Sequence, residues 1–300
     1  MAAGVGQLIQ STDYNSIRTT VDAVMGKNAS GYGQTLSSSA VSAGNVISAL
    51  QWLNLRTDMV KARQHQIGSA VGSTTATDGR NLALPASGAA ITEALRAQFA
   101  SMATTITTNQ RSVDSDGAGG QLADEDLITV TRSTAWNGTL THTVTITANA
   151  GGDGAASNLR YFFNAGGSIR VSANITTGSS KNNTWNTMFT QIGEFRMNYA
   201  DTTFTGSSAV GSSIGFDDLT TADQIIGQKA APSGSYAENR YYLRAKTQAS
   251  GTQIVLTISY EDNDVGDTQF DEDVQPTLNT VIKQFRPSGS NVSVLTPTAA

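Results

Sequence analysis

The sequence predicts an α+β protein, with an N-terminal helical hairpin or bundle followed by an antiparallel β-sandwich or sheet with one covering helix. Two observations support this class. Apolar residues recur every three or four positions up to about residue 109, and every second position in the segments beyond residue 125. A segment rich in glycine, serine and aspartate separates the two patterns. We therefore expect a helical docking region at 1–112, a linker at 113–124 and a mainly antiparallel β domain at 125–300.

Three helices are expected in the first region. The first begins near Thr12 or Asp13, either of which can cap it, and ends at Gly26. The second runs from about residue 45 to 65, and the third begins after Pro85. Each apolar stripe is narrow, so it needs a partner helix or another chain to cover it. The stripes contain Tyr14, Ile17, Val21 and Val24, then Val46, Ile47, Leu50, Leu53, Met59 and Val60, then Ile91, Leu95, Phe99, Met102 and Ile106.

The second region alternates with the period of a β-strand. From Thr139 to Ala148, threonine occupies every odd position through 147, which predicts a strand with one apolar and one hydroxyl face. Asn137-Gly138 is a strong hairpin signal and predicts a turn joining this strand to one at Leu127–Arg132. Residues 183–192 have helical spacing and would cover one face of the sheet. Further strands are expected at 169–175, 241–246, 253–260 and 278–285.

Composition excludes several classes of function. Of 300 residues, 31 are serine and 39 threonine, only 14% are charged, and the net charge is -5. A nucleic-acid partner would need clustered lysine and arginine, so none is expected. The lack of cysteine excludes thiolate metal sites, and two histidines leave little for imidazole ligands or catalytic triads. No signal-peptide pattern and no apolar run long enough for a bilayer are present, so we expect no membrane partner and no cofactor.

The densest acidic cluster follows the strand at 253–260. Asp262, Asp264 and Asp267 offer hard oxygen ligands on a short loop, which is the chemistry that suits Ca²⁺. The spacing of an EF-hand loop is absent, so an acidic turn kept soluble by its charge is the favoured interpretation. Carboxylate pairs for glycoside hydrolysis, such as neighbouring Asp217 and Asp218, would point to opposite strand faces. We therefore assign no catalytic residue.

Neither histidine is expected to bind a metal. His142 lies on the apolar face of its strand, which predicts a hydrogen-bonded core residue. His65 lies at the polar end of the second helix, where a positive charge is favourable opposite the helix macrodipole.

Apolar helical stripes joined to a hydroxyl-rich, weakly charged sheet favour a subunit of a larger assembly. Small uncharged side chains pack against a neighbour without burying an unpaired charge, although the hydroxyl face could equally face solvent. We expect a homo-oligomer whose helices dock onto other copies or other proteins. The expected docking residues are Tyr14, Ile17, Val21, Leu50, Trp52 and Leu53. A carbohydrate-binding module is the alternative, with aromatic candidates Tyr161, Tyr236, Tyr241 and Tyr242.

Several segments resemble a known class of protein. They are residues 13–18, 30–34, 52–58, 63–66, 158–170 (NLRYFFNAGGSIR, the most specific), 258–262 and 286–294. Together they resemble virion structural proteins of tailed bacteriophages, especially contractile-tailed phages. The resemblance implies a non-enzymatic component of the tail, neck or fibre apparatus, assembled in the host cytoplasm as a homo-oligomer beside other virion proteins. Long heptads and glycine-triplet repeats are absent, so a compact connector or appendage component is expected rather than a fibre shaft. Host attachment through a surface glycan is the alternative role.

Overall fold

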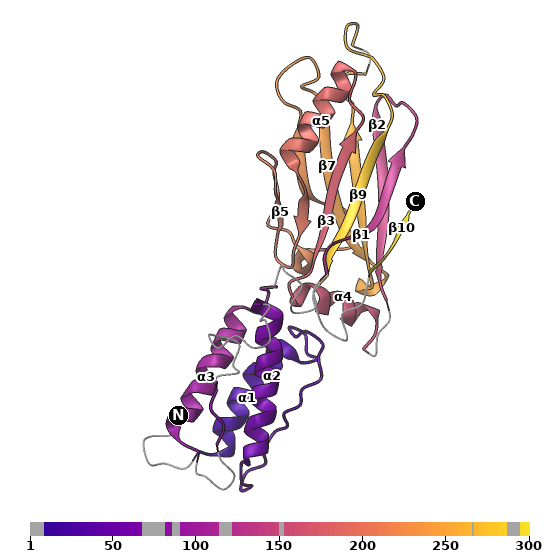
Figure 1. The fold of residues 1–300 in the computed structure, drawn as a ribbon. Coiled ribbons are helices and arrows are strands. Elements are labelled where there is room, and N and C mark those ends of the chain that lie inside the picture. The colour runs from indigo at the N-terminus through magenta and orange to yellow at the C-terminus, as the bar shows by residue number, and fades with distance from the viewer. Residues whose placement is uncertain are drawn as a thin grey trace. The chain divides into compact units, whose positions relative to one another are not determined.

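The computed structural model describes residues 9–67, 82–85, 91–113, 122–149, 153–265, 267–286 and 295–300. These residues form two compact units, of which the first is helical and the second contains the sheets (Figure 1). The first unit takes its described residues from the chain up to Ala123 and from Arg160–Gly166, and the second takes all the other described residues. Helices followed by antiparallel sheets confirm the predicted α+β class.

Three long helices build the first unit: α1 (Ser11–Met25), α2 (Ala49–Ile67) and α3 (Glu93–Thr108). The side chain of Thr92 accepts a hydrogen bond from the backbone N–H of Leu95 and so caps the start of α3. All three helices contact one another. The stripes expected for the first and third helices contain most of their buried residues, whereas in the second helix, which begins four residues later than expected, at Ala49, only Met59 of the expected stripe is buried.

Aromatic rings fill the centre of the helical unit. The Trp52 ring lies edge-on to Tyr14, with centroids 5.4 Å apart, and edge-on to Phe99, with centroids 4.6 Å apart. All three side chains are fully buried. The helical stripes therefore cover one another inside a single chain, which is the first of the two alternatives that their narrow width left open.

The helix α4 (Ala155–Asn164) has no counterpart among the expected elements. Its last turn belongs to the helical unit, because Asn164 Nδ2 donates to the carbonyl oxygens of Ala29 at 2.9 Å and Gly31 at 3.1 Å. The structure therefore corrects the predicted division into 1–112 and 125–300. Residues 160–166 come from the predicted β domain but belong to the helical unit.

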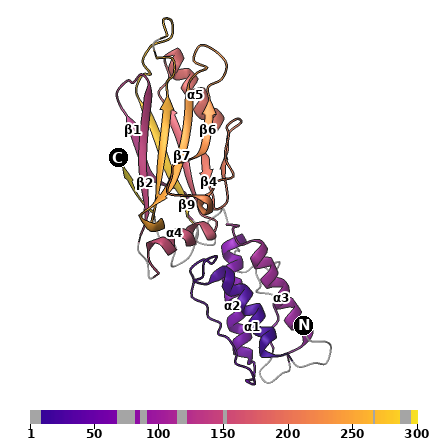
Figure 2. The ribbon, with the colours of Figure 1, turned by 180° about the vertical axis from the view of Figure 1, so that it is seen from behind.

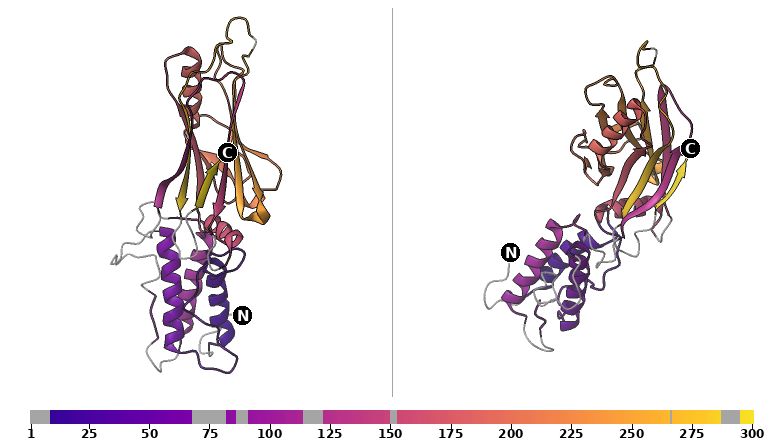
Figure 3. Two further views of the ribbon diagram at one scale, coloured as in Figure 1. Left: turned by 90° about the vertical axis from the view of Figure 1, so that its right-hand side faces the viewer. Right: turned by 45° about the horizontal axis from the view of Figure 1, so that its top comes forward.

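Two five-stranded sheets form the second unit, and their described pairings are antiparallel (Figures 1 and 2). The first sheet has the order β1 (Leu122–Arg132), β9 (Leu278–Arg286), β3 (Ser168–Ile175), β4 (Phe195–Met197) and β5 (Thr202–Phe204). The second has the order β10 (Leu295–Ala299), β2 (Thr139–Ala148), β8 (Gln253–Glu261), β7 (Arg240–Gln248) and β6 (Gln224–Ala230). Short 3-10 turns lie at Phe216–Asp218 and Ala249–Gly251. Figure 3 (left) shows these two sheets nearly edge on.

The hairpin predicted at Asn137-Gly138 is wrong. Strand β1 belongs to the first sheet and β2 to the second, so the turn carries the chain from one sheet to the other. Gly138 has a φ of +87°, as a tight turn requires. Its carbonyl accepts from Asp262 N at 3.0 Å, and Trp136 pairs with Val274, so contacts with distant segments decide which strands β1 and β2 join.

The interior of the second unit joins residues from both sheets. His142 on β2 shares a 2.7 Å hydrogen bond with Thr280 on β9, which confirms its predicted place in the core. The Phe195 ring on β4 stacks on Tyr241 of β7 with centroids 5.8 Å apart. Burial lowers the pKa of His142, and the charge of Arg132 lowers it further, so the imidazole is neutral at pH 7.

The helix α5 (Ser180–Ile192) places two aromatic side chains beside Tyr260 of β8. Trp185 and Phe189 lie 6.0 Å and 5.8 Å from Tyr260 of β8, measured between ring centroids. The helical spacing predicted at 183–192 is therefore confirmed, and the helix itself begins three residues earlier, at Ser180.

Candidate functional site

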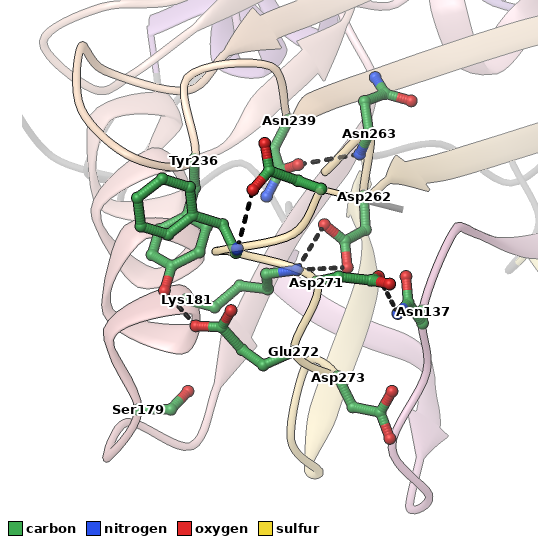
Figure 4. Close-up of polar contacts among 12 residues, drawn as sticks. Asn137, Ser179, Lys181, Tyr236, Asn239, Asp262, Asn263, Asp271, Glu272 and Asp273 are labelled. Carbon is green, nitrogen blue, oxygen red and sulfur yellow. Dashed lines mark hydrogen bonds and ion pairs between the residues drawn. The ribbon is translucent and has the colours of Figure 1, made fainter. Parts of the chain in front are cut away.

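A fully buried lysine lies at the start of α5, among the loops at one end of the β unit (Figure 4). Lys181 Nζ lies 3.1 Å from Oδ1 and 3.0 Å from Oδ2 of Asp262, and both side chains have no exposed surface. The same ammonium lies 5.5 Å from the ring centroid of Tyr236. A charge this deeply buried is costly unless it is paired, so this cluster is the most unusual chemical feature of the β unit.

The start of α5 is held in place by hydrogen bonds to two neighbouring segments. Ser179 Oγ accepts from the backbone N–H of Asn182 at 3.1 Å and caps the helix. The Asn182 amide donates to the carbonyl oxygens of Thr176 at 2.7 Å and Gln275 at 3.0 Å, and accepts from Gln275 N at 2.9 Å. These contacts fix the position of the Lys181 backbone.

The partner carboxylate is positioned just as firmly. Asp262 directly follows β8, and its backbone N–H donates to Gly138 O at 3.0 Å. The next residue, Asn263, donates from its backbone to Asn239 Oδ1 at 2.9 Å and from its side chain to Glu238 O at 3.0 Å. Neither member of the ion pair lies on a free loop.

A tyrosine and a glutamate close the other side of the lysine. The Tyr236 hydroxyl donates to Glu272 Oε1, and its ring lies edge-on to Phe270 with centroids 5.8 Å apart. Beside them, Asn137 Nδ2 donates to Asp271 Oδ1 at 2.7 Å (Figure 4). Burial, followed by the hydrogen bond to Glu272, raises the pKa of Tyr236 to about 12, so this phenol remains a donor at pH 7.

Two carboxyl groups in this cluster have raised pKa values. Burial raises the pKa of Asp262, although its hydrogen bonds and charge interaction with Lys181 oppose the shift. Burial also raises the pKa of Asp264, again opposed by the charge of Lys181. Asp264 Oδ2 is buried without a hydrogen-bond partner among the described residues. The site therefore combines one amine and two carboxyl groups that burial drives toward their protonated forms.

The predicted calcium ligands do not converge on a cation site. Asp262 is bonded to Lys181, whereas Asp267 Oδ1 accepts from the backbone N–H groups of Gln269 at 2.7 Å and Phe270 at 3.0 Å. In the part of the chain that the structure describes, no three histidine, aspartate or glutamate side chains gather as metal ligands. The lysine occupies the position beside Asp262 that a cation would need.

Most of the predicted docking residues are unavailable for docking. Tyr14, Ile17, Val21 and Trp52 lie inside the helical unit and are at most 5% exposed. Only Leu50 and Leu53 reach the surface, with 62% and 38% of their area exposed, and Val46, just before α2, is 87% exposed. This corrects the prediction, because the other α helices cover the four buried side chains. We name Val46, Leu50 and Leu53 the α2 apolar stripe.

The predicted aromatic candidates for sugar binding are also mainly internal. Tyr161, Tyr236 and Tyr241 are buried. Tyr242 on β7 is half-buried, and it lines a depression of about 450 Å³ whose other residues include Val210, Gln228 and Arg240. Of the four tyrosines, only Tyr242 is placed where a ligand could reach it.

His65 differs from its expected surface position. It is buried, and its Nε2 lies 2.7 Å from the carbonyl oxygen of Ala165. Burial lowers its pKa, so at pH 7 the ring is neutral and supplies no cation to the helix end. His65 is buried because residues 160–166, which belong to the helical unit, cover this end of α2.

Lys181 was not among the residues predicted to have a function. The sequence nevertheless contains one indication, a lysine in the first turn of α5, where the positive end of the helix macrodipole repels its charge. Such a residue needs a compensating carboxylate, and the acidic segment after β8 supplies it. The pairing of two residues so far apart in the chain is visible only in the fold.

Comparison of the chain with models of protein families and with curated proteins, and of its fold with solved structures, finds no match. Within the described ranges, none of the helices has both the length and the apolar character required to cross a bilayer.

Proposed function

We propose that the chain is a non-enzymatic structural subunit of a tailed-phage virion, an oligomeric connector or appendage component of the tail, neck or fibre apparatus. The observation that carries the proposal is the α2 apolar stripe, in which Leu50 and Leu53 are exposed three positions apart on the helix and Val46 is exposed three residues before it begins. Burying such a stripe against another copy or another virion protein removes apolar surface from water, at about 25 cal/mol per Å² before the costs of association.

The outer face of the second sheet suits lateral packing in such an assembly. Along β2, partly or fully exposed threonines alternate with the buried His142, Val144, Ile146 and Ala148. Strand β10 sets the exposed Thr296 and Thr298 opposite Thr147 and Thr145. Hydroxyl groups of this kind can bond to a neighbour without burying charge. In the finer architecture we propose, the two sheets form a sandwich and α5 covers the inner face of the second.

The test is the oligomeric state of the full-length chain, measured by native mass spectrometry and by light scattering after size exclusion. The double variant Leu50→Asp/Leu53→Asp should shift the oligomer toward monomer, because it places charges in the contact. The matched control is Val265→Asp, which changes an apolar residue of the β unit that is 55% exposed. A monomeric wild-type chain, or an oligomer unaffected by the double variant, would reject this role for the stripe.

A second candidate function, host attachment through a glycan, is favoured by the depression at Tyr242. The Tyr242 ring has the Arg244 guanidinium carbon 4.7 Å from its centroid, so a sugar would stack on the opposite face. Gln228 and Arg240 beside the ring supply hydrogen-bond donors, which together with a stacking face are the usual components of a sugar site. A glycan array should give signals for the full-length chain that Tyr242→Ala abolishes. Equal signals from the two proteins would eliminate Tyr242 as a sugar-binding residue.

A further inference from the structure

The pair of Lys181 and Asp262 has a role that assembly leaves unexplained. Both side chains are completely buried, and neither belongs to the α2 apolar stripe or to the threonine face. A buried ion pair adds little stability by itself, because the loss of hydration offsets the attraction of the charges. Its geometry nevertheless holds an amine nitrogen against a carboxyl group at 3.0 and 3.1 Å, with no exposed surface on either side chain.

The described surroundings offer Nζ few hydrogen-bond acceptors. An ammonium carries three N–H donors, whereas the described residues offer Nζ the oxygens of a single carboxylate as hydrogen-bond acceptors. Transfer of one proton from Nζ to Asp262 gives a neutral amine and a carboxylic acid, and burial, which raises the pKa of Asp262, favours the acid form of that group. The neutral amine is a nucleophile, and the protonated carboxyl carbon can accept its attack.

A third group can carry the protons. The backbone N–H of Asp264 donates a hydrogen bond to the Asp262 carboxylate, and the Asp264 carboxyl group interacts electrostatically with Lys181 and Asp262. Its Oδ2 is buried and has no hydrogen-bond partner among the described residues. Asp264 is thus a candidate general acid and base for these two groups.

We propose that Lys181 and Asp262 join covalently, through an intramolecular amide bond between Nζ and Cγ. The lone pair of Nζ attacks Cγ and forms a tetrahedral intermediate. Asp264 accepts a proton from the nitrogen and returns it to a carboxyl oxygen, which leaves as water while the C–N bond becomes an amide. One N–C bond forms, one C–O bond breaks, and one water molecule is released, so no oxidant or cofactor is required.

The cross-link would join the first turn of α5 to the end of β8 and close a loop that contains β4, β5, β6, β7 and β8. Such a closure restricts the unfolded chain, as a disulfide does, in a protein that has no cysteine. It would form in the folded chain whether or not that chain enters a virion.

The test is peptide mass spectrometry of the purified full-length protein after denaturation and trypsin digestion. A linked chain escapes cleavage at Lys181 and gives a branched species, peptide 171–196 joined to peptide 247–283, lighter than their sum by one water molecule. We expect this species in the wild-type protein. A separate peptide 171–181 and an unmodified peptide 247–283 from fully folded protein would overturn the proposal.

Three variants separate the cross-link from an ordinary ion pair. Lys181→Met and Asp262→Ala should each abolish the branched species. The matched control is Lys246→Met, which removes the lysine of the exposed pair with Asp223 at 3.3 Å and should leave the linkage intact, with the second peptide then beginning at residue 245. If the branched species persisted in Lys181→Met, another lysine would be responsible and the assignment would be wrong.

The role of Asp264 has its own measurement. Asp264→Asn keeps the size of the side chain and removes its ability to carry a proton, so the linked fraction at equal times after synthesis should fall several-fold. A linked fraction equal to that of the wild type, with the β unit folded, would show that Asp264 takes no part.

Discussion

Replacement of Trp52 by alanine tests whether the helical unit is held together by its own aromatic core. The Trp52 side chain is fully buried between the rings of Tyr14 and Phe99, which lie 5.4 and 4.6 Å away. Removal of a buried tryptophan typically costs about 3–5 kcal/mol through lost burial and the cavity that remains. Both edge-to-face contacts are also lost, so we expect about 4 kcal/mol for Trp52→Ala.

The neighbouring residue provides the control. Leu53 is one position along α2 and 38% exposed, so Leu53→Ala should change stability by less than about 1 kcal/mol. Hydrogen exchange measured by mass spectrometry on peptides from α1 and α3 reports the stability of the helical unit separately from that of the β unit. A decrease of about 4 kcal/mol in the unfolding free energy corresponds to roughly thousandfold faster exchange at amides that exchange only when the whole unit opens.

The comparison distinguishes a core from a docking surface. If Trp52 were a docking residue, as the sequence alone indicated, its replacement would weaken assembly and leave exchange in α1 and α3 nearly unchanged. Equal exchange in Trp52→Ala and Leu53→Ala would therefore refute the packing described for this unit.

Two further predictions concern a close contact and a buried imidazole in the helical unit. Gly33 has a φ of +73°, and an added Cβ would lie 2.3 Å from the Tyr161 ring, so Gly33→Ala should destabilise the unit by at least about 2 kcal/mol. Gly44→Ala is the control, because Gly44 has a φ of +83° and open space around it; equal losses in thermal or urea unfolding would show that the Tyr161 contact is unimportant. Burial lowers the pKa of His65 in the folded chain below its usual value of about 6.5. At pH values between these two pKa values, the unfolded chain binds a proton that the folded chain does not. Protection of α2 from exchange, corrected for intrinsic rates, should therefore fall as the pH drops from about 7 to about 5, and His65→Gln should remove this slope; an unchanged slope would place its origin elsewhere.

Local periodicity was sufficient to predict much of the fold. The strand predicted at Thr139–Ala148 has those bounds in the structure, because alternation of threonine with apolar residues specifies both the strand and its buried face. The helix α1 ends where Gly26 predicted. Helix α4 was missed, since its ten residues give a short stripe and its last turn is stabilised by the distant loop at Ala29 and Gly31.

The candidate site was less predictable than the elements that carry it. Asp262 and Asp264 stand out in the sequence as members of an acidic loop, yet their partner Lys181 lies on another element and in a different stretch of the chain. The acidic residues alone therefore indicated a cation, and the fold shows that the cation beside Asp262 is the ammonium of a lysine.

The sequence by itself determined the position of most of the longer helices and strands and the buried side of segments such as α1 and β2, because these properties depend on residues within a few positions of one another. Only the tertiary structure decided what covers each apolar side. It placed Trp52 in a core and left Leu50 exposed, sent β1 and β2 to different sheets, and brought Lys181 to Asp262. The physical reason is that burial and pairing depend on distances between segments remote in the chain, which local spacing does not encode.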